Sequence, residues 1–165
     1  MYMDYDIQGN LLPPGQIEIN DVEFRLSFVD AYPKSVNRPM IYQGYLQYKS
    51  TIENTVTVDF EQWINGSWVS NKPNPNDIDL VILVGLPDVK PDIFVHNQLL
   101  NKYGSKDKYH VDAYLIIVCP EDDPRYDVLT KKTMEYWDKW WSHDRNNNEK
   151  GYIVLKTQFQ GVKNV

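Results

Sequence analysis

Two aspartates ahead of an apolar segment are the residues of this sequence best suited to chemistry. Asp77 and Asp79 stand two residues apart, and Asp79 leads directly into the apolar stretch Leu80–Val84. Residues two apart on a β-strand project from the same face, so the two carboxylates would lie side by side. Parallel carboxylates repel each other unless a cation lies between them, and Mg²⁺ prefers such oxygen ligands. The spacing therefore predicts a magnesium site at the end of a strand.

A glycine and a serine precede this pair and suggest where phosphate groups would bind. Gly66 and Ser67 follow a segment of alternating apolar residues, and nine residues separate Ser67 from Asp77. Glycine lets a ligand approach the backbone closely, and free amides with a serine hydroxyl bind phosphate oxygens. We therefore expect Gly66, Ser67 and the nearby Lys72 to bind a nucleotide. A lysine in a polar loop is more often a solvated surface residue, and Lys150 is open to the same two interpretations.

A third carboxylate, Asp112, lies on the apolar segment 109–118, another expected strand. If this strand lies beside the expected strand over 77–84, the three carboxylates come close together. We therefore expect Asp77, Asp79 and Asp112 to be catalytic metal ligands. Asp112 would bind a second metal ion or help to deprotonate an attacking hydroxyl. His110 would face the same way as Asp112. The competing interpretation is a solvated strand end, the usual meaning of an isolated Asp-x-Asp-Leu.

The elements that position these residues follow from the periodicity of the apolar side chains. Alternating or continuous apolar stretches predict strands over residues 56–64, 77–84, 109–118 and 151–158. Helical spacing predicts helices over 22–29, 39–53, 91–103 and 126–143, after an extended arm that ends in a turn near Gly15. This order predicts an α/β (α+β) fold with a mixed sheet of about four strands flanked by helices. We expect one domain over 1–165, with an arm and two helices in 1–55 and the core in 56–165.

The expected helices have recognisable ends and apolar faces. Asn20 or Asp21 can cap the first helix, with Glu23 completing a capping box. On the second helix, apolar side chains recur on one face at Ile41, Tyr45, Tyr48 and Ile52. The last helix has an aromatic-rich stripe made of Tyr126, Leu129, Thr133, Tyr136, Trp137, Trp140 and Trp141. Such a stripe is more often core than a surface that stacks bases or receives a partner.

Composition limits the classes of protein. Among 165 residues, 17 basic and 23 acidic ones give a formal net charge of −6. This balance disfavours attachment to nucleic acid through bulk positive charge, although it is compatible with a local basic groove. The arginines Arg25, Arg38 and Arg125 show no pattern that assigns them a role. The single Cys119 allows neither an intramolecular disulfide nor a cysteine zinc cage. No apolar run approaches the roughly 20 residues of a membrane span, and no signal peptide is visible, so we expect a cytoplasmic protein without a membrane partner.

The whole set of motifs resembles the polymerase-beta-type nucleotidyltransferase superfamily. It consists of Gly-Ser, nine residues, Asp-Ile-Asp-Leu and a later Asp on an apolar strand. The chain is also similar to a small, poorly characterised bacterial family of nucleotidyltransferase-like proteins, through LPPG (12–15), INGSWV (64–69), KPNPNDIDL (72–80), Asp112 and KG (150–151). The resemblance implies a single nucleotidyltransferase-like domain. In it, Asp77, Asp79 and Asp112 would bind Mg²⁺, or Mn²⁺ in its place, and Gly66 and Ser67 would hold an NTP such as ATP.

The function implied by the resemblance is a Mg²⁺-dependent enzyme that transfers a nucleoside monophosphate from an NTP. The acceptor would be a hydroxyl of RNA (such as tRNA), of a protein or of a small molecule, in the setting of a bacterial toxin–antitoxin or phage-defence system. Two departures support an alternative. Trp68 and Val69 follow Gly-Ser where small members often have an Arg and a second Gly, and we expect no separate helical domain that would bind an acceptor. The alternative is a catalytically silent module of the same fold that binds a partner protein, as an antitoxin does.

Overall fold

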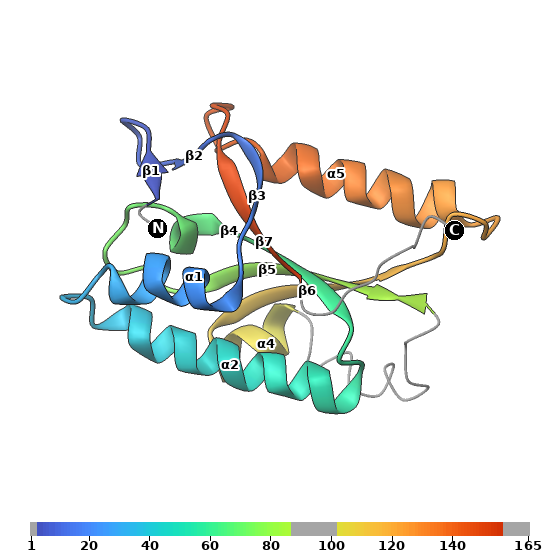
Figure 1. Ribbon diagram of the computed structural model, residues 1–165, viewed down its shortest axis with the longest axis horizontal. Helices are drawn as coiled ribbons and strands as arrows, with labels where there is room; N and C mark the ends of the chain where they lie inside the picture. The colour runs from blue at the N-terminus through green and yellow to red at the C-terminus, as the bar shows by residue number, and fades with distance from the viewer. Residues whose placement is uncertain (1–2, 87–101, 157–165) are drawn as a thin grey trace.

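A mixed five-stranded sheet forms the centre of the molecule (Figure 1). The computed structural model describes residues 3–86 and 102–156. Across the sheet, the strands are β3 (Gly15–Glu18), β7 (Gly151–Lys156), β4 (Phe60–Asn65), β5 (Ile78–Gly85) and β6 (Val111–Val118). The pairs β3–β7 and β5–β6 are parallel, whereas β4 is antiparallel to both of its neighbours. Two short strands, β1 (Asp4–Tyr5) and β2 (Leu11–Leu12), form a separate antiparallel pair.

Helices cover both faces of the sheet and give the molecule three layers (Figure 1). One face is covered by α1 (Asp21–Arg25), α2 (Asn37–Thr55) and α4 (Lys102–Tyr109), and the other by α5 (Lys132–Trp141). The expected α/β class, with a mixed sheet flanked by helices, is therefore confirmed. Within the described residues, no helix is long and apolar enough to cross a membrane.

The strand that contains Asp79, β5, is buried on both of its faces from Leu80 to Val84. Leu80, Ile82 and Val84 lie in the core beneath α1 and α2, whereas Val81 and Leu83 lie in the core beneath α5. All five side chains are at most 1% exposed. A strand covered on both faces has a continuous apolar sequence instead of an alternating one. This burial explains why the segment is such a clear strand signal in the sequence.

The first two expected helices are confirmed together with their local features. The Asn20 side chain accepts a hydrogen bond from Glu23 N (2.9 Å), and the Glu23 carboxylate accepts one from Asn20 N (3.1 Å), which completes the capping box. After α1 the chain continues as a π-helix, η1 (Leu26–Asp30). In α2, all four residues expected on the apolar face are fully buried: Ile41, Tyr45, Tyr48 and Ile52.

The sheet has one strand more than expected, because the end of the expected arm pairs with β7. Only Ile17 is apolar in the four residues of β3, so no alternation marks the strand, and its partner β7 is far away in the sequence. The strand expected from residue 56 begins at Phe60. α2 runs on to Thr55, and the Val56 amide still donates to Ile52 O (2.8 Å).

The helix expected over 91–103 falls largely outside the described residues. Of its positions, the structure describes 102 and 103, which belong to α4 (Lys102–Tyr109). The same helix includes Gly104 and Ser105, two residues that the prediction placed after the expected helix. Ser105 is fully buried and its Oγ accepts a hydrogen bond from Ala113 N (3.4 Å) in β6. Packing against β6 therefore outweighs the low helix propensity of a Gly-Ser pair. Residues 157 and 158 of the last expected strand also lie outside the described residues.

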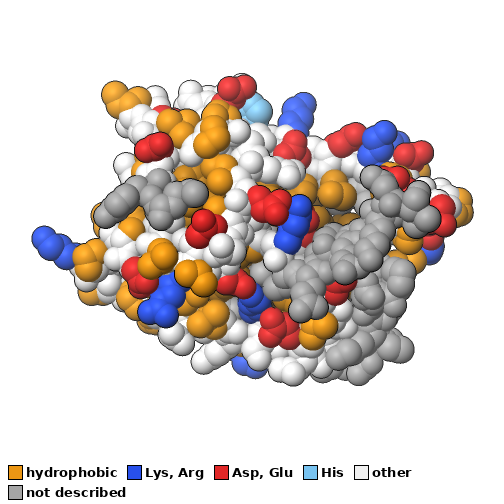
Figure 2. Space-filling view, in the orientation of Figure 1, with side chains coloured by type: hydrophobic (Ala, Val, Ile, Leu, Met, Phe, Trp, Pro, Cys, Tyr) orange, Lys and Arg blue, Asp and Glu red, His pale blue; other side chains and the backbone are white. Residues whose placement is uncertain are grey.

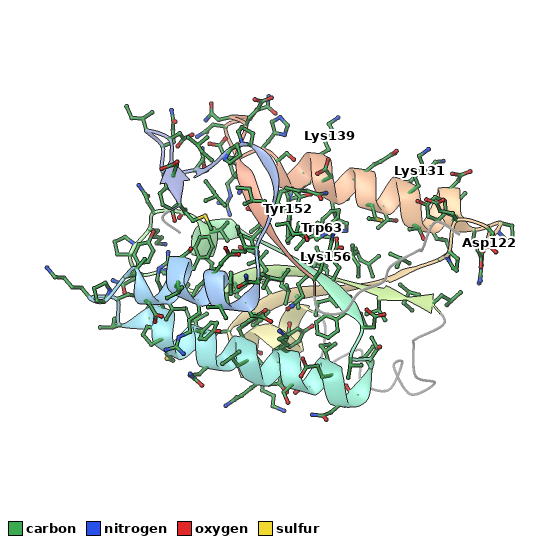
Figure 3. The ribbon with its side chains drawn as sticks, in the orientation of Figure 1. Trp63, Asp122, Lys131, Lys139, Tyr152 and Lys156 are labelled. Carbon is green, nitrogen blue, oxygen red and sulfur yellow. The ribbon has the colours of Figure 1, made fainter. Side chains whose placement is uncertain are left out.

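The aromatic stripe of the last helix is only partly buried, so the expectation of a core face was partly wrong. Trp141 is 5% exposed and Trp137 packs beside it, but Tyr136 is 60% and Trp140 65% exposed. Adjacent residues on an α-helix point about 100° apart, so Tyr136 and Trp137 cannot both face the sheet. The helix also begins as a π-helix, η4 (Tyr126–Lys131), whose wider turn changes the phase of the pattern. The buried side is completed by Trp63 and Tyr152, which lie between the sheet and α5 (Figure 3).

Candidate functional site

The parallel pairing of β5 and β6 brings the expected carboxylates to one edge of the sheet. Asp79 lies directly opposite Asp112 in the register of the two strands, and Asp77 immediately precedes β5. Facing residues of neighbouring strands are about 5 Å apart, so these side chains share one small region. Asp77 and Asp112 are each mostly buried, with side chains 17% and 16% exposed. The structure thus brings together three side chains that lie up to 35 positions apart in the sequence.

Gly66 lies against Asp79 from the other side. In the antiparallel pairing of β4 with β5, Asn65 is opposite Asp79, so Gly66 comes next to the carboxylate. Gly66 has a φ of 76°, which an L-residue with a side chain rarely adopts. A Cβ on residue 66 would also overlap Oδ2 of Asp79. Both constraints require glycine at this position, and together they link the Gly-Ser motif to the aspartates.

A buried anchor holds the turn that contains Ser67. The turn is the 3₁₀-helix η2 (Gly66–Val69), in which Trp68 is fully buried and Val69 is 2% exposed. Trp68 packs near Phe24 of α1, with ring centroids 6.3 Å apart. The two residues that depart from the superfamily pattern therefore fill the core, and the partly exposed Ser67 remains on the side of the turn that faces outward.

Arg38 of α2 holds the loop that joins this turn to Asp77. The side chain is fully buried, and its five N–H groups donate to five backbone carbonyls: Phe28 (2.7 Å), Trp68 (2.8 Å), Ser70 (3.1 Å), Lys72 (2.7 Å) and Pro73 (3.3 Å). Its guanidinium also lies over the Tyr32 ring, 3.9 Å from the centroid. Burial lowers the pKa of Arg38. Sequence reasoning assigned Arg38 no role, because a cation that binds only carbonyls leaves no partner pattern in the sequence.

Lys72, which was expected to bind a nucleotide, lies in this loop with an exposed side chain. Its carbonyl accepts a hydrogen bond from Arg38, and its amide donates to Ser70 Oγ (3.2 Å). Among the described residues, the cations that interact with the aspartates are Lys106 and Lys150. Lys106 was missed because the Gly-Ser before it was taken as the end of a helix, whereas it lies inside α4.

Lys106 makes the closest contacts with the cluster. Its Nζ lies 2.5 Å from Asp77 Oδ2 and 3.7 Å from Asp112 Oδ2. The hydrogen bond to Asp77 raises the pKa of Lys106. The second oxygen of Asp112, Oδ1, is buried and has no hydrogen-bond partner within the part of the chain that the structure describes. One ammonium group therefore neutralises the cluster incompletely.

Lys150 approaches from the start of β7. Its Nζ donates to Asn65 Oδ1 (2.8 Å), and the Asn65 amide donates to the Trp141 carbonyl at the end of α5 (3.0 Å). Burial lowers the pKa of Lys150, while the charge of Asp79 opposes that shift. Burial also raises the pKa of Asp79 to about 6, with further contributions from the like charges of Asp77 and Asp112. An additional cation beside Asp79 would therefore stabilise its charged form.

The cluster fits a hard divalent cation by the chemistry of its donors. It offers carboxylate oxygens, one of which is buried with no hydrogen-bond partner among the described residues, and carboxylates with water are the ligands that Mg²⁺ uses in proteins. As they stand, no three His, Cys, Asp or Glu side chains of the described residues are arranged closely enough to hold a metal ion. In this arrangement the positive charge between Asp77 and Asp112 is supplied by Lys106.

A cavity of about 450 Å³ lies elsewhere, between η1 and α2. Its walls include Val29, Tyr32, Pro39, Tyr42 and Leu46, and its lining contains none of Asp77, Asp79 and Asp112. The cavity is therefore separate from the carboxylate site, which lies where β5 and β6 begin.

Comparison with known proteins places the chain in a family. Neither the curated proteins nor the solved structures include a significant match. A family model matches residues 3–156, which include every described residue of the site. The chain therefore belongs to DUF6932, a family of unknown function.

Proposed function

We propose that this protein is a Mg²⁺-dependent nucleotidyltransferase with a single nucleotidyltransferase-like domain. It transfers a nucleoside monophosphate from an NTP to a hydroxyl of RNA, of a protein or of a small molecule. The supporting observation is the strand register, in which Asp79 has Asp112 on one side and Asn65, followed by Gly66, on the other. Three separate motifs thus meet at one sheet edge, as a site for a metal-bound nucleotide requires.

Each residue has a distinct role in the proposed reaction. The bound metal would polarise the phosphoryl oxygens and so favour attack by the acceptor hydroxyl. Asp77 and Asp79, with Asp112, are the ligands. Asp112 would also take the hydroxyl proton as the oxygen bonds to the α-phosphorus and pyrophosphate departs. The amides of Gly66 and Ser67 would bind phosphate oxygens.

The acceptor is bound locally in this proposal. On the face shown in Figure 2, Lys and Arg side chains stand apart, with acidic side chains between them. A net charge of −6 gives the chain no overall positive field to attract an RNA, and the described residues on this face form no broad basic patch. Contacts close to the aspartates would therefore select the acceptor. A role in a toxin–antitoxin or phage-defence system rests on the sequence resemblance alone.

Transfer of label from a nucleotide tests the proposal. The protein is incubated with labelled NTPs, Mg²⁺ and cell extract, in parallel with the double variant Asp77→Ala/Asp79→Ala. The matched control, Glu121→Ala/Asp122→Ala, removes two exposed acids beyond the far end of β6, where Asp122 is labelled in Figure 3. We expect the control to label the acceptor and the first variant to lose labelling. Equal labelling by wild type and Asp77→Ala/Asp79→Ala would refute the proposal.

Two observations favour the second candidate, a silent module that binds a partner protein. Lys106 already forms ion pairs with two of the aspartates, and Tyr136 and Trp140 expose aromatic surface on α5. Calorimetry with ATP or GTP distinguishes the two candidates. Nucleotide binding that requires Mg²⁺ supports the enzyme, whereas a folded protein that binds neither nucleotide supports the module.

A further inference from the structure

The position of Lys106 is set by a helix that is tightly attached to β6. Ser105, the preceding residue, is fully buried and accepts a hydrogen bond from the Ala113 amide, next to Asp112. At the end of α4, the Tyr109 ring packs against Tyr48 of α2, with centroids 5.6 Å apart. The backbone of Lys106 is therefore held in place beside the aspartates. Its side chain is less constrained, because it is 49% exposed.

We propose that Lys106 is the resident counter-ion of the aspartate cluster, and that a divalent cation binds by displacing its ammonium group from Asp77 and Asp112. This inference rests on the proposed function for the metal site itself. It adds that the strength of metal binding is governed by a residue that is not a ligand. Lys106 is thus a positioning residue, since it acts through the aspartates that it contacts.

The physical basis is competition for the same oxygens. Both contacts of Lys106 use Oδ2 atoms, at 2.5 Å from Asp77 and 3.7 Å from Asp112, so the ammonium stands between the two carboxylates. Two cations cannot share that space without strong repulsion. A divalent ion brings twice the charge, and the flexible, half-exposed stem of lysine can withdraw into solvent while α4 stays in place.

Removing the ammonium group should strengthen metal binding. Lys106→Met keeps the apolar stem and deletes the competing charge. Partly exposed ion pairs contribute about 0.2–1 kcal/mol each, so the loss of two contacts predicts divalent binding about 2- to 30-fold tighter. The metal-free variant should melt at a lower temperature than wild type, because its aspartates lose their counter-ion. It should also gain more thermal stability on addition of the metal.

The probe is Mn²⁺ alone, without nucleotide. Calorimetric titration and the electron paramagnetic resonance signal of free Mn²⁺ give the affinity of the full chain. The matched control is Lys108→Met, which removes the same charge from the same helix. The Lys108 ammonium lies over the Tyr109 ring, 4.9 Å from its centroid, instead of between aspartates. Lys106→Gln is the second variant, and far-UV circular dichroism verifies the fold of each protein.

Tighter Mn²⁺ binding by both Lys106 variants, with Lys108→Met close to wild type, supports the inference. Binding seen only in the Lys106 variants supports it too, and then indicates that wild type is the silent module. Equal affinity in wild type and the Lys106 variants overturns the inference but leaves the proposed function standing, provided that Asp77→Ala/Asp79→Ala abolishes binding. Equal gains from Lys106→Met and Lys108→Met overturn it as well, since long-range charge would then explain the effect. Absence of Mn²⁺ binding from every protein overturns both proposals.

Discussion

The sharpest test of how this site is built is the substitution Arg38→Lys. Arg38 joins α2 to the loop between Gly66 and Asp77 through five hydrogen bonds to backbone carbonyls, and none of its partners is a carboxylate. Lysine keeps the positive charge but has three N–H donors where arginine has five. The substitution therefore changes hydrogen bonding with little change of charge.

The expected loss follows from the carbonyls that remain without a donor. At least two of the five lose their partner, and each buried unsatisfied group costs about 1–3 kcal/mol, so we expect unfolding to become easier by about 3 kcal/mol. For a domain of this size, about 3 kcal/mol lowers the melting temperature by roughly 6–12 °C. The same change should loosen the loop that leads to Asp77 and weaken Mn²⁺ binding.

Thermal and urea unfolding, followed by circular dichroism, measure the effect. The control is Arg25→Lys, because Arg25 is 62% exposed and makes one ion pair, to Asp30 at 3.4 Å. We expect this control to change the free energy of unfolding by less than about 0.5 kcal/mol. If Arg38→Lys unfolds like the control, the five hydrogen bonds do not hold the loop and the reasoning is wrong.

Two further predictions concern Gly66 and Glu61. Gly66→Ala should destabilise the protein by about 1–3 kcal/mol more than Gly15→Ala, and it should weaken Mn²⁺ binding. Both glycines have a positive φ, but only at Gly66 would a Cβ meet the Asp79 carboxylate. Urea unfolding of the two variants measures this difference, and equal losses would contradict it. Burial raises the pKa of Glu61, against the opposing hydrogen bond from Trp63 Nε1 (2.6 Å), so folding favours the protonated form. The wild-type free energy of unfolding should therefore fall, relative to that of Glu61→Gln, as pH rises from the ordinary glutamate pKa through the raised one. If the free energies of unfolding of the two proteins change in parallel with pH, Glu61 does not cause the pH dependence.

Much of the local structure could be predicted because it depends on residues close together in the chain. The capping box at Asn20 and the apolar face of α2 involve neighbours three or four positions apart. β5 was clear because burial on both faces requires a continuous apolar sequence. The ends of the helices were harder to predict. Ser105 packs against β6, so α4 includes a Gly-Ser pair that the sequence pattern placed outside a helix.

The candidate site also has a part that the sequence predicts and a part that depends on tertiary contacts. The sequence by itself determined which carboxylates are available, because Asp77 and Asp79 must leave one face of a strand and Asp112 lies on a later one. Only the tertiary structure decided their surroundings. Lys106 and Lys150, and not Lys72, interact with the aspartates, and Arg38 holds the connecting loop. Contacts between residues tens of positions apart depend on strand order and helix packing, and no short-range pattern encodes them. The acids of the site could thus be predicted from their spacing, whereas the cations that control them became visible only in the folded chain.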